Sequence, residues 1–289
     1  MPRGTSSSVL LPDAPPPASA GVLRFEHVSV AFDDVPALQD VSFEVRQAET
    51  RIILGAAGSG KTVLLKTALG LVQPQSGSVH VFGQDITRMT EQQLFGIRSK
   101  LGMLFQESAL FDSLTIEENV AYPLVNQKAI QCPIEDVSKR VREALRFVEL
   151  EHTLSRFPSE LSGGMRRRVA IARAVVTTPP LLLYDSPTAG LDPITAHTIM
   201  ALIIKERDLS KIATLIVTHR YQDGALMANF RYNPDNGKLE PARGVGNNIT
   251  RTTKFLVLRE GRLVFEGTQA ELEASTDAYI SKFRKQSGG

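Results

Sequence analysis

Gly55-Ala-Ala-Gly-Ser-Gly-Lys-Thr62 decides the fold, because it fits the pattern G-x-x-x-x-G-K-[ST] at every fixed position. It follows a largely apolar run at 51–54, which predicts a buried strand, and precedes 63–69, which predicts a helix. The glycines let the backbone curl so that successive amides face inward, and the start of a helix adds positive potential. We therefore expect a concave anion-binding loop, rather than a glycine-rich turn without a ligand.

Residues at two places in the chain are candidates for contact with a magnesium–nucleotide complex. Lys61 is placed to reach the β- and γ-phosphates, and the Thr62 hydroxyl to ligate Mg²⁺. The apolar run 181–185 predicts a fully buried parallel strand that ends in a carboxylate. Asp185 would hold the same ion through water. A strand that merely ends at a surface aspartate is the alternative, and the loop upstream argues against it.

Composition is that of an ordinary globular protein. The 289 residues suffice for a large α/β domain, and 42% hydrophobic and 22% charged residues are usual values. A net charge of +2 provides no strong field for a polyanion, and a single cysteine excludes an internal disulfide framework. No apolar run approaches the roughly 20 residues that span a bilayer, so we expect any membrane role to go through a partner.

Hydrophobic periodicity divides the rest of the chain into strands and helices. Alternation over 23–45 predicts two or three strands, and 101–105 predicts a buried strand that ends at Gln106. The stretch 115–158 looks helical throughout and opens on a capping-box pattern, Thr115 to Glu118. Further strands are expected at 78–82 and 214–218, helices at 90–100, 165–176, 193–207, 269–274 and 277–283, and a closing hairpin at 255–265. Such alternation predicts a parallel sheet with its ligand at the carboxyl ends of the strands.

Leu161-Ser-Gly-Gly-Met165 lies between the P-loop and the strand that ends at Asp185. This stretch resembles the signature motif of the ABC-type ATPases, the ATP-binding subunits of ABC transporters. The other matches are Gln106 to the Q-loop, Ala189-Gly-Leu-Asp192 to the D-loop, His219 to the switch histidine and Phe32 to the aromatic residue that stacks on adenine. Together these features imply an α/β fold: a P-loop NTPase core with a mainly parallel sheet, an N-terminal antiparallel β subdomain and an inserted α-helical subdomain.

The resemblance implies ATP and Mg²⁺ as ligands and assigns roles to particular residues. The implied metal ligands are Thr62, Gln106 and Asp185, and the implied catalytic residues are Ser186, His219 and Gln106. The implied nucleotide contacts are Phe32, Gly55, Ala56, Ala57, Gly58, Ser59, Gly60, Lys61, Thr62, Gln106, Ser162, Gly163, Gly164, Asp192 and His219.

The signature motif also implies a dimer. Ser162 and the amides of Gly163 and Gly164 stand at a helix N-terminus, which suits a γ-phosphate. In the family this phosphate belongs to ATP held by the opposite subunit, so two ATP molecules are sandwiched between two chains. A homodimer is expected, with a heterodimer as the alternative. The arginines at 166–168 are interpreted as the solvated flank of the signature helix.

One position departs from the family pattern. The family's general base is a glutamate directly after the magnesium-site aspartate, and this chain has Ser186 there. A serine hydroxyl can orient water without drawing its proton, and loss of a positioned base typically costs about 10²- to 10⁴-fold in rate. Four interpretations stand. Gln106 and His219 could position the water, or the chain could pair with a different subunit that carries a competent site. ATP binding and release could drive the cycle with little chemistry, or residue 186 could have been substituted deliberately to hold the ATP-bound dimer. We favour an active ATPase with unusual water positioning.

The resemblance implies a membrane partner as well. In ABC importers and exporters the segment after the Q-loop glutamine, here 107–124, receives a coupling helix from an integral membrane permease. The chain looks most like the ATPases of Mla/Mce phospholipid and lipid transport systems. This likeness is carried by the sequence at 103–124, by Met165 and by the continuation Asp192-Pro-Ile-Thr195. That likeness implies an Mce-domain or other lipid-binding partner and a cytoplasmic location, peripheral on the inner membrane through the permease.

Other functions remain as alternatives. One is an ABC ATPase of another importer class, and a second is a soluble ABC ATPase that acts on nucleic acid or ribosomes. A third is a scaffold whose closure, rather than turnover, is the output. Soluble members usually carry long coiled coils or two tandem ATPase units, and neither pattern occurs in this sequence. We therefore expect no nucleic-acid partner.

The expected organisation is a disordered tail at 1–21 and an ABC ATPase domain at 22–285. Within that domain the helical subdomain covers about 107–178, and a C-terminal hairpin and helices cover 254–285. An insertion at about 229–253 breaks the strand–helix rhythm. It is either a surface hairpin without a task or an added contact with a regulator, the dimer mate or the permease.

Overall fold

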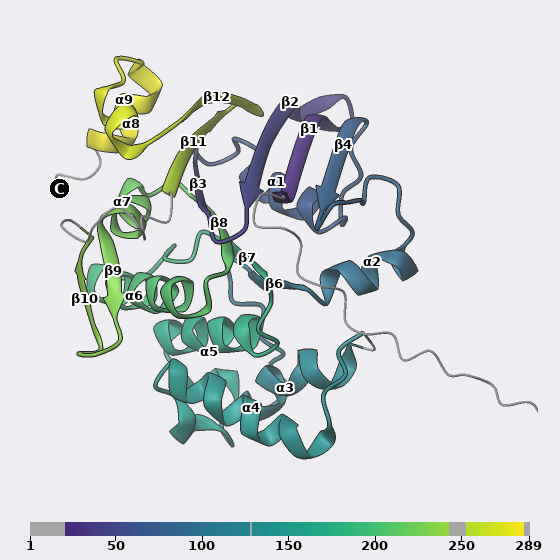
Figure 1. The fold of residues 1–289 in the computed structure, drawn as a ribbon, viewed down its shortest axis with the longest axis vertical. Coiled ribbons are helices and arrows are strands. Elements are labelled where there is room, and N and C mark those ends of the chain that lie inside the picture. The colour runs from purple at the N-terminus through teal and green to yellow at the C-terminus, as the bar shows by residue number, and fades with distance from the viewer. Residues whose placement is uncertain (1–20, 128, 243–252, 286–289) are drawn as a thin grey trace, which may run out of the picture.

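The computed structural model of the protein describes residues 21–127, 129–242 and 253–285, and a six-stranded sheet lies at its centre (Figure 1). The strand order is β12-β11-β3-β8-β7-β6. The strands are β3 (Thr50–Leu54), β6 (Leu101–Leu104), β7 (Leu181–Asp185), β8 (Ala213–Thr218), β11 (Thr253–Arg259) and β12 (Arg262–Gly267). Neighbours from β11 to β6 pair in parallel, and β12 pairs with β11 in antiparallel fashion. The predicted α/β fold with a mainly parallel sheet is confirmed.

The strands β3, β7 and β8 at the middle of this sheet are buried on both faces, which explains why they read as largely apolar runs. On one face Ile53 and Leu183 pack with the helix α1 (Lys61–Ala68). On the other face Ile52 and Leu182 pack with α5 (Gly163–Val175) and α6 (Pro193–Ser210). With both faces covered, the strand ends are the part of the sheet that can present side chains to a ligand.

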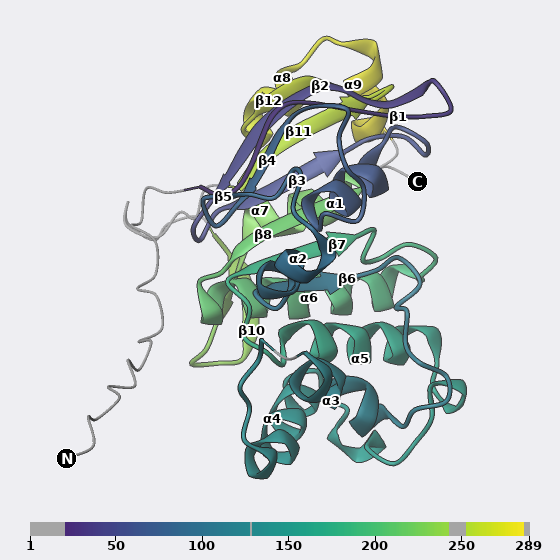
Figure 2. The same ribbon diagram turned by 90° about the vertical axis from the view of Figure 1, so that its right-hand side faces the viewer.

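A second sheet, antiparallel, covers α1 from the outside, and Figure 2 shows α1 between the two sheets. Its strand order is β2-β1-β4-β5. The elements on this side are β1 (Gly21–Phe32), β2 (Val35–Arg46), β4 (Ser76–Val81), β5 (Gln84–Asp85) and α2 (Glu91–Arg98). Phe25 and Phe43 stack with their ring centroids 4.9 Å apart on adjacent strands. The predicted antiparallel β subdomain is confirmed. The predicted tail at 1–21 lies outside the described residues except for Gly21, which opens β1.

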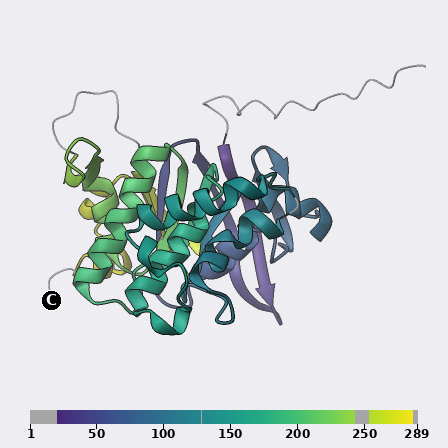
Figure 3. The same cartoon turned by 90° about the horizontal axis from the view of Figure 1, so that it is seen from below.

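Helices cover the side of the molecule that lies opposite the antiparallel sheet, as Figure 3 shows. The helices α3 (Ile116–Asn126) and α4 (Ile134–Phe147) pack on α5. The predicted capping box is confirmed, because the Glu118 carboxylate accepts the Thr115 amide at 2.7 Å and the Thr115 hydroxyl accepts the Glu118 amide at 3.3 Å. The expectation of helix throughout 115–158 is wrong. The chain is extended at Gln127, Pro133 caps α4, and only 3₁₀ turns follow at Glu151–Thr153 and Pro158–Glu160.

Part of the predicted insertion forms a hairpin that lies along α6. The chain runs from α7 (Tyr221–Asn229) into β9 (Phe230–Asn233) and β10 (Lys238–Pro241), and 243–252 lies outside the described residues. The Asp208 carboxylate on α6 accepts the Tyr232 amide at 2.8 Å. The Lys205 ammonium lies 4.4 Å from the ring centroid of Phe147 at the end of α4 and 5.7 Å from that of Tyr232. Lys205 therefore joins the hairpin to the helical subdomain.

The C-terminal helices α8 (Gln269–Ala274) and α9 (Ala278–Lys285) lie beside the β11–β12 hairpin (Figure 1). Ile280 and Phe283 of α9 are buried in the same core as α5 and α6. Among the helices that the structure describes, none combines the length and the apolar character needed to cross a bilayer.

Candidate functional site

Four neighbouring strands of the central sheet end in residues that the sequence singled out. The P-loop (55–62) follows β3, and His219 follows β8 beside it. Asp185 ends β7, and Gln106 lies two residues after the end of β6. The Gly55 amide donates to the Thr218 carbonyl at 3.3 Å, which ties the P-loop to the segment before His219. Residues far apart in the chain are thus brought to one edge of the sheet.

The P-loop has the curled backbone that its glycines predict. Gly58 and Gly60 have φ angles of +76° and +103°, a region that favours glycine. Gly60 precedes the first residue of α1, and a Cβ there would lie 2.4 Å from the Ala37 carbonyl oxygen. Any larger residue at position 60 would therefore push the loop away from β2.

Lys61 lies folded into the loop that precedes it. Its side chain is buried, and its ammonium donates to the carbonyl oxygens of Gly55 at 2.9 Å and Ala56 at 2.7 Å, and to the Ser59 hydroxyl at 3.4 Å. Burial lowers the pKa of Lys61, and the negative charge of Asp185 opposes that shift. The Lys61 ammonium is therefore held at the centre of the loop, where the oxygens of a polyphosphate would compete with the carbonyl oxygens for its hydrogen bonds.

Asp185 connects the P-loop to the end of β7. Its carboxylate is 3% exposed and accepts the Thr62 hydroxyl at 2.8 Å through Oδ2. Oδ1 accepts the hydroxyl of Ser186 at 3.1 Å. The Thr62 and Asp185 oxygens are hard ligands of the kind that Mg²⁺ prefers, and they lie side by side. The residues present fit a magnesium site that water and phosphate oxygens would complete.

Ser186 turns the chain sharply out of the sheet. Its φ angle is +48°, uncommon for a residue with a side chain. Its amide donates to the Val217 carbonyl on β8 at 2.8 Å, which holds the turn in place. The side chain is buried, and its hydroxyl lies against Asp185. At this position the site offers a hydroxyl where the family pattern has a carboxylate.

His219 and Gln106 are both exposed at the strand ends. Behind His219 lies a buried carboxylate, Asp223, which sequence reasoning missed although it is four residues away. Asp223 Oδ2 accepts the Thr188 hydroxyl at 2.7 Å and the Thr218 hydroxyl at 2.9 Å. Burial raises the pKa of Asp223, and these hydroxyl groups oppose the shift. Asp223 thus joins the segment after Ser186 to the residue before His219.

The signature motif opens α5. Ser162 caps the helix, its hydroxyl accepting the Met165 amide at 3.2 Å, and both Ser162 and Gly163 are exposed. Asp192 of the D-loop caps α6 in the same way by accepting the amides of Ile194 and Thr195 at 3.1 and 3.0 Å. Phe32, at the end of β1, has 49% of its surface exposed. In the described part of the chain, no hydrogen bond joins Ser162 to the P-loop.

The three arginines after the signature do not form a solvated flank, which corrects the sequence interpretation. Arg167 is 6% exposed and donates to the carbonyl oxygens of Phe105 at 3.1 Å and Ala189 at 3.4 Å. Arg166 and Arg168 are partly buried and donate to the carbonyl oxygens of Leu161 and Val148. Arg167 therefore connects the segments before Gln106 and before Asp192.

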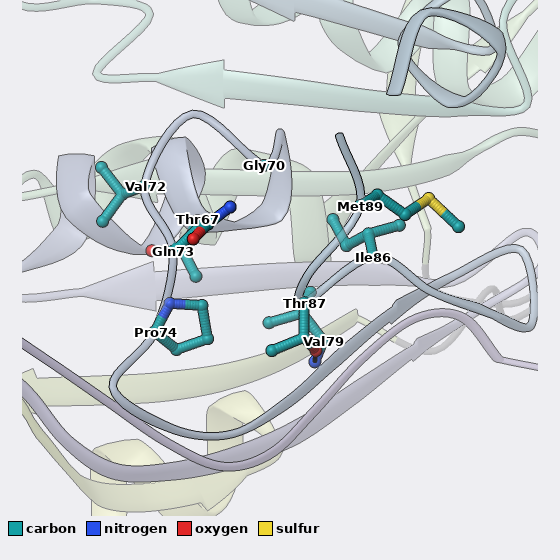
Figure 4. A pocket seen from close by; sticks show the side chains of 9 residues that line it. All are labelled: Thr67, Gly70, Val72, Gln73, Pro74, Val79, Ile86, Thr87 and Met89. Atoms are coloured by element: carbon teal, nitrogen blue, oxygen red, sulfur yellow. Dashed lines mark hydrogen bonds between the residues drawn. The ribbon is translucent and has the colours of Figure 1, made fainter. Parts of the chain in front are cut away.

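A hollow behind the far end of α1 does not belong to this site (Figure 4). Apolar side chains such as Val72, Ile86 and Met89 line it, and it leaves no room for a water molecule. It is a packing seam between α1 and the β4–β5 strands.

The P-loop on β3 and the Thr62–Asp185 pair define a P-loop nucleoside triphosphatase. A model of the family described as ABC transporter matches residues 38–189, and the chain belongs to this family. Its fold and class are those of an ABC-type ATPase, whose cassette is the ATP-binding part of an ABC transporter.

Curated relatives and solved structures agree with this class. The chain is 42% identical over 185 residues to methionine import ATP-binding protein MetN of Carboxydothermus hydrogenoformans, covering 64% of this chain and 54% of that protein. It is 36% identical over 202 residues to MetN 1 of Bacillus thuringiensis subsp. konkukian, covering 68% and 59%. The chain thus spans between half and two thirds of the length of these relatives.

Two solved structures are similar to this one. The ATP-binding cassette MJ0796, a dimer bound to ADP and Pi in a post-hydrolysis state, matches with a TM-score of 0.70 and 28% identity, over 85% of this chain and 98% of that one. The cbiO1 structure from Clostridium perfringens, part of the ABC transporter complex cbiONQ, matches with a TM-score of 0.72 and 26% identity, over 92% and 94%.

Proposed function

We propose that this chain is the subunit that binds and hydrolyses ATP to drive a membrane ABC importer. The observation that carries the proposal is the row of four strand ends, on β3, β8, β7 and β6, that carry the P-loop, His219, Asp185 and Gln106. Phosphoryl transfer needs positioning and charge stabilisation more than covalent chemistry from the protein. A row of fixed residues at one sheet edge supplies that positioning.

The P-loop amides and Lys61 hold the triphosphate, and Phe32 offers an exposed ring for the adenine. To bind phosphate, the Lys61 ammonium exchanges acceptors, leaving one of the Gly55 or Ala56 carbonyl oxygens for a phosphate oxygen. Thr62 and Asp185 would hold Mg²⁺, with Gln106 as a further ligand. When bound, the metal neutralises charge on the β- and γ-phosphates.

Hydrolysis is slow because the water is oriented without a strong base. Ser186 and His219 can hydrogen-bond the attacking water, and Gln106 can position it from the other strand end. The Ser186 hydroxyl donates a hydrogen bond to Asp185. The lone pairs of the Ser186 oxygen therefore remain available to accept a hydrogen bond from water. Its turn is fixed by the Val217 carbonyl, so the hydroxyl group is held in place.

Two copies complete the site as a homodimer, with a heterodimer as the alternative. Ser162 and Gly163 are exposed at the start of α5, where helix amides favour an anion. The dimeric MJ0796 cassette, similar over most of this chain, supports this arrangement. Each Ser162 then contacts the γ-phosphate held by the P-loop of the other copy, and Asp192 lies at the seam.

A groove beside the segment after Gln106 supports a membrane permease as partner. It has a volume of about 410 Å³ and is lined by side chains that include Met103, Phe105, Phe111, Tyr122 and Arg173. Phe105, Phe111 and Tyr122 are each between 38% and 41% exposed. Such an aromatic hollow fits an inserted helix, and it overlaps the segment 107–124. We place the chain on the cytoplasmic face of the cell membrane through this contact.

The identity of the transported cargo is the most specific part of the proposal. Relatives that carry the name methionine import ATP-binding protein support a small-solute importer, which we favour. Mla/Mce-type lipid transport, with an Mce-domain partner, is the second candidate, and it is supported by the text at 103–124 and by Met165. The permease and its partners select the cargo, so reading frames beside this one distinguish the two.

Copurification tests the proposal. The tagged chain, expressed with its neighbouring reading frames, should retain an integral membrane permease, and Phe111→Asp should release it. Phe95→Asp is the matched control, because Phe95 is 63% exposed on α2 and is not one of the residues that line the groove. Recovery of ribosomes or DNA instead of a membrane protein would contradict the proposal.

A further inference from the structure

The P-loop is backed on its outer side by the C-terminal third of the chain. The Gly261 amide, in the β11–β12 turn, donates to the Ser59 carbonyl at 3.1 Å. The Ala56 amide donates to the hydroxyl of Tyr279 on α9 at 3.0 Å. A Cβ on Gly55 would lie 2.7 Å from the Leu258 carbonyl oxygen, so this backing is in close contact. Three residues of the loop that is proposed to hold phosphate therefore touch segments some 200 positions later in the sequence.

The Tyr279 hydroxyl both accepts and donates a hydrogen bond. It accepts the Ala56 amide and donates to the Leu258 carbonyl at 3.1 Å, so a single group joins the P-loop to β11. Ala56 comes before the curled part of the loop, where β3 has ended and α1 has not begun. Its amide has no place in either element, and Tyr279 supplies its acceptor.

The helix that carries Tyr279 is held in place by both polar and apolar contacts. Asp277 accepts the amides of Tyr279 at 2.7 Å and Ile280 at 3.1 Å, which starts α9. The Arg259 guanidinium lies 5.6 Å from the centroid of the Tyr279 ring and 3.9 Å from the Asp277 carboxylate. Phe283 meets the same ring edge to face at 5.3 Å, and its own side chain is buried. The ring is thus fixed on two sides, so its hydroxyl keeps a defined position.

We propose that Tyr279 is a positioning residue for nucleotide binding, and that α9 sets ATP affinity through it. The inference rests on the proposed function, since it assumes that the P-loop binds ATP. A loop already held in its binding conformation loses less conformational entropy when phosphate arrives. A partner that displaced α9 would remove the hydroxyl from Ala56 and weaken nucleotide binding without touching Lys61 or Thr62.

The test is Tyr279→Phe in the full chain, which keeps the ring and removes the hydroxyl. Equilibrium titration with a fluorescent ATP analogue and magnesium should show affinity about 3- to 10-fold weaker, the factor expected for one or two hydrogen bonds of ordinary net strength. Turnover at saturating ATP should change by less than about 2-fold, because groups at the γ-phosphate are untouched. Tyr232→Phe is the control, since Tyr232 lies on the hairpin along α6.

A nucleotide-free readout separates this inference from the proposed function. Hydrogen exchange of peptides that contain Ala56 should be faster in Tyr279→Phe than in the wild-type chain, and unchanged in Tyr232→Phe. Wild-type affinity and exchange in Tyr279→Phe would overturn the role of Tyr279 and leave the proposed function standing. A wild-type chain that bound no ATP would overturn both, whatever the exchange showed.

Discussion

Two halves of the proposed nucleotide site differ in how complete they are. The phosphate side, made of the P-loop and Asp185, contains each charged or hydroxyl group that its pattern requires, and Thr62 lies 2.8 Å from Asp185. The water side, made of Gln106, Ser186 and His219, has a hydroxyl where a base is expected. The halves are adjacent, since Ser186 hydrogen-bonds Asp185. Under the proposed function, this difference predicts that ATP binding and ATP hydrolysis can be separated by a single side chain.

The largest effect is expected on the phosphate side. Lys61→Ala should weaken ATP binding by about 10²- to 10³-fold, because it removes a cation that would make charge-assisted hydrogen bonds to two phosphates. Equilibrium binding measures this effect. Lys205→Met removes a lysine that lies on α6 near Phe147, and it should leave ATP affinity unchanged. If Lys61→Ala bound ATP normally, the phosphate side would be misassigned.

On the water side, His219→Ala should reduce turnover by about 10²-fold, the cost of a misplaced reacting water. ATP affinity should stay within about 2-fold of wild type, because His219 lies at the end of β8 rather than in the P-loop. Steady-state phosphate release and equilibrium binding together measure the split. Equal losses in both quantities would erase the distinction between the two sides.

A smaller effect is expected behind the water side. Asp223→Ala leaves the Thr188 and Thr218 hydroxyls without their acceptor, so the segments that carry Ser186 and His219 lose their common anchor. Turnover should fall about 10-fold, with ATP affinity little changed. Asp223→Asn keeps an oxygen acceptor and should recover most of the activity. An asparagine variant as slow as the alanine variant would mean that the negative charge, rather than the anchor, matters.

The smallest effect concerns Glu206, a buried carboxylate outside both sides. Burial raises the pKa of Glu206, and Ser210 and Lys205 oppose the shift. The folded protein binds this proton more tightly than the unfolded chain, so stability is highest below the unfolded pKa and falls as pH rises through the folded pKa. Glu206→Gln should therefore melt higher than wild type at pH 8, and the difference should vanish in acid. A variant that melts lower at pH 8 would show that ionised Glu206 stabilises the fold.

Local sequence signals predicted most of the elements and the phosphate side. The P-loop pattern needs only a strand before it and a helix after it, and both follow from apolar periodicity. Likewise Thr115 and Glu118 announce the start of α3 because a capping box is a contact between neighbours in sequence. Asp185 was found because it ends an apolar run long enough for a buried parallel strand, and ligands bind at the carboxyl ends of such strands.

Contacts between distant segments could not be predicted in this way. Tyr279 lies 223 residues from Ala56, and no local pattern records that pairing. Arg167 looked solvated beside two other arginines, yet it is buried, because its partners are the carbonyl oxygens of Phe105 and Ala189. The sequence analysis does not predict the break in helix after Asn126, although Pro133 sets the start of α4.

The central claim is that the chain is an active ATPase whose rate is limited by Ser186. Magnesium-dependent phosphate release from the purified protein tests it most directly, in wild type, Ser186→Glu and Ser186→Gln, with ATP affinity measured alongside. Wild type should release phosphate slowly but measurably, and Ser186→Glu should be faster by about 10²-fold at similar affinity. Ser186→Gln, close in size but without a carboxylate, should gain little. A wild type that released no phosphate, with activity appearing only in Ser186→Glu, would contradict the account.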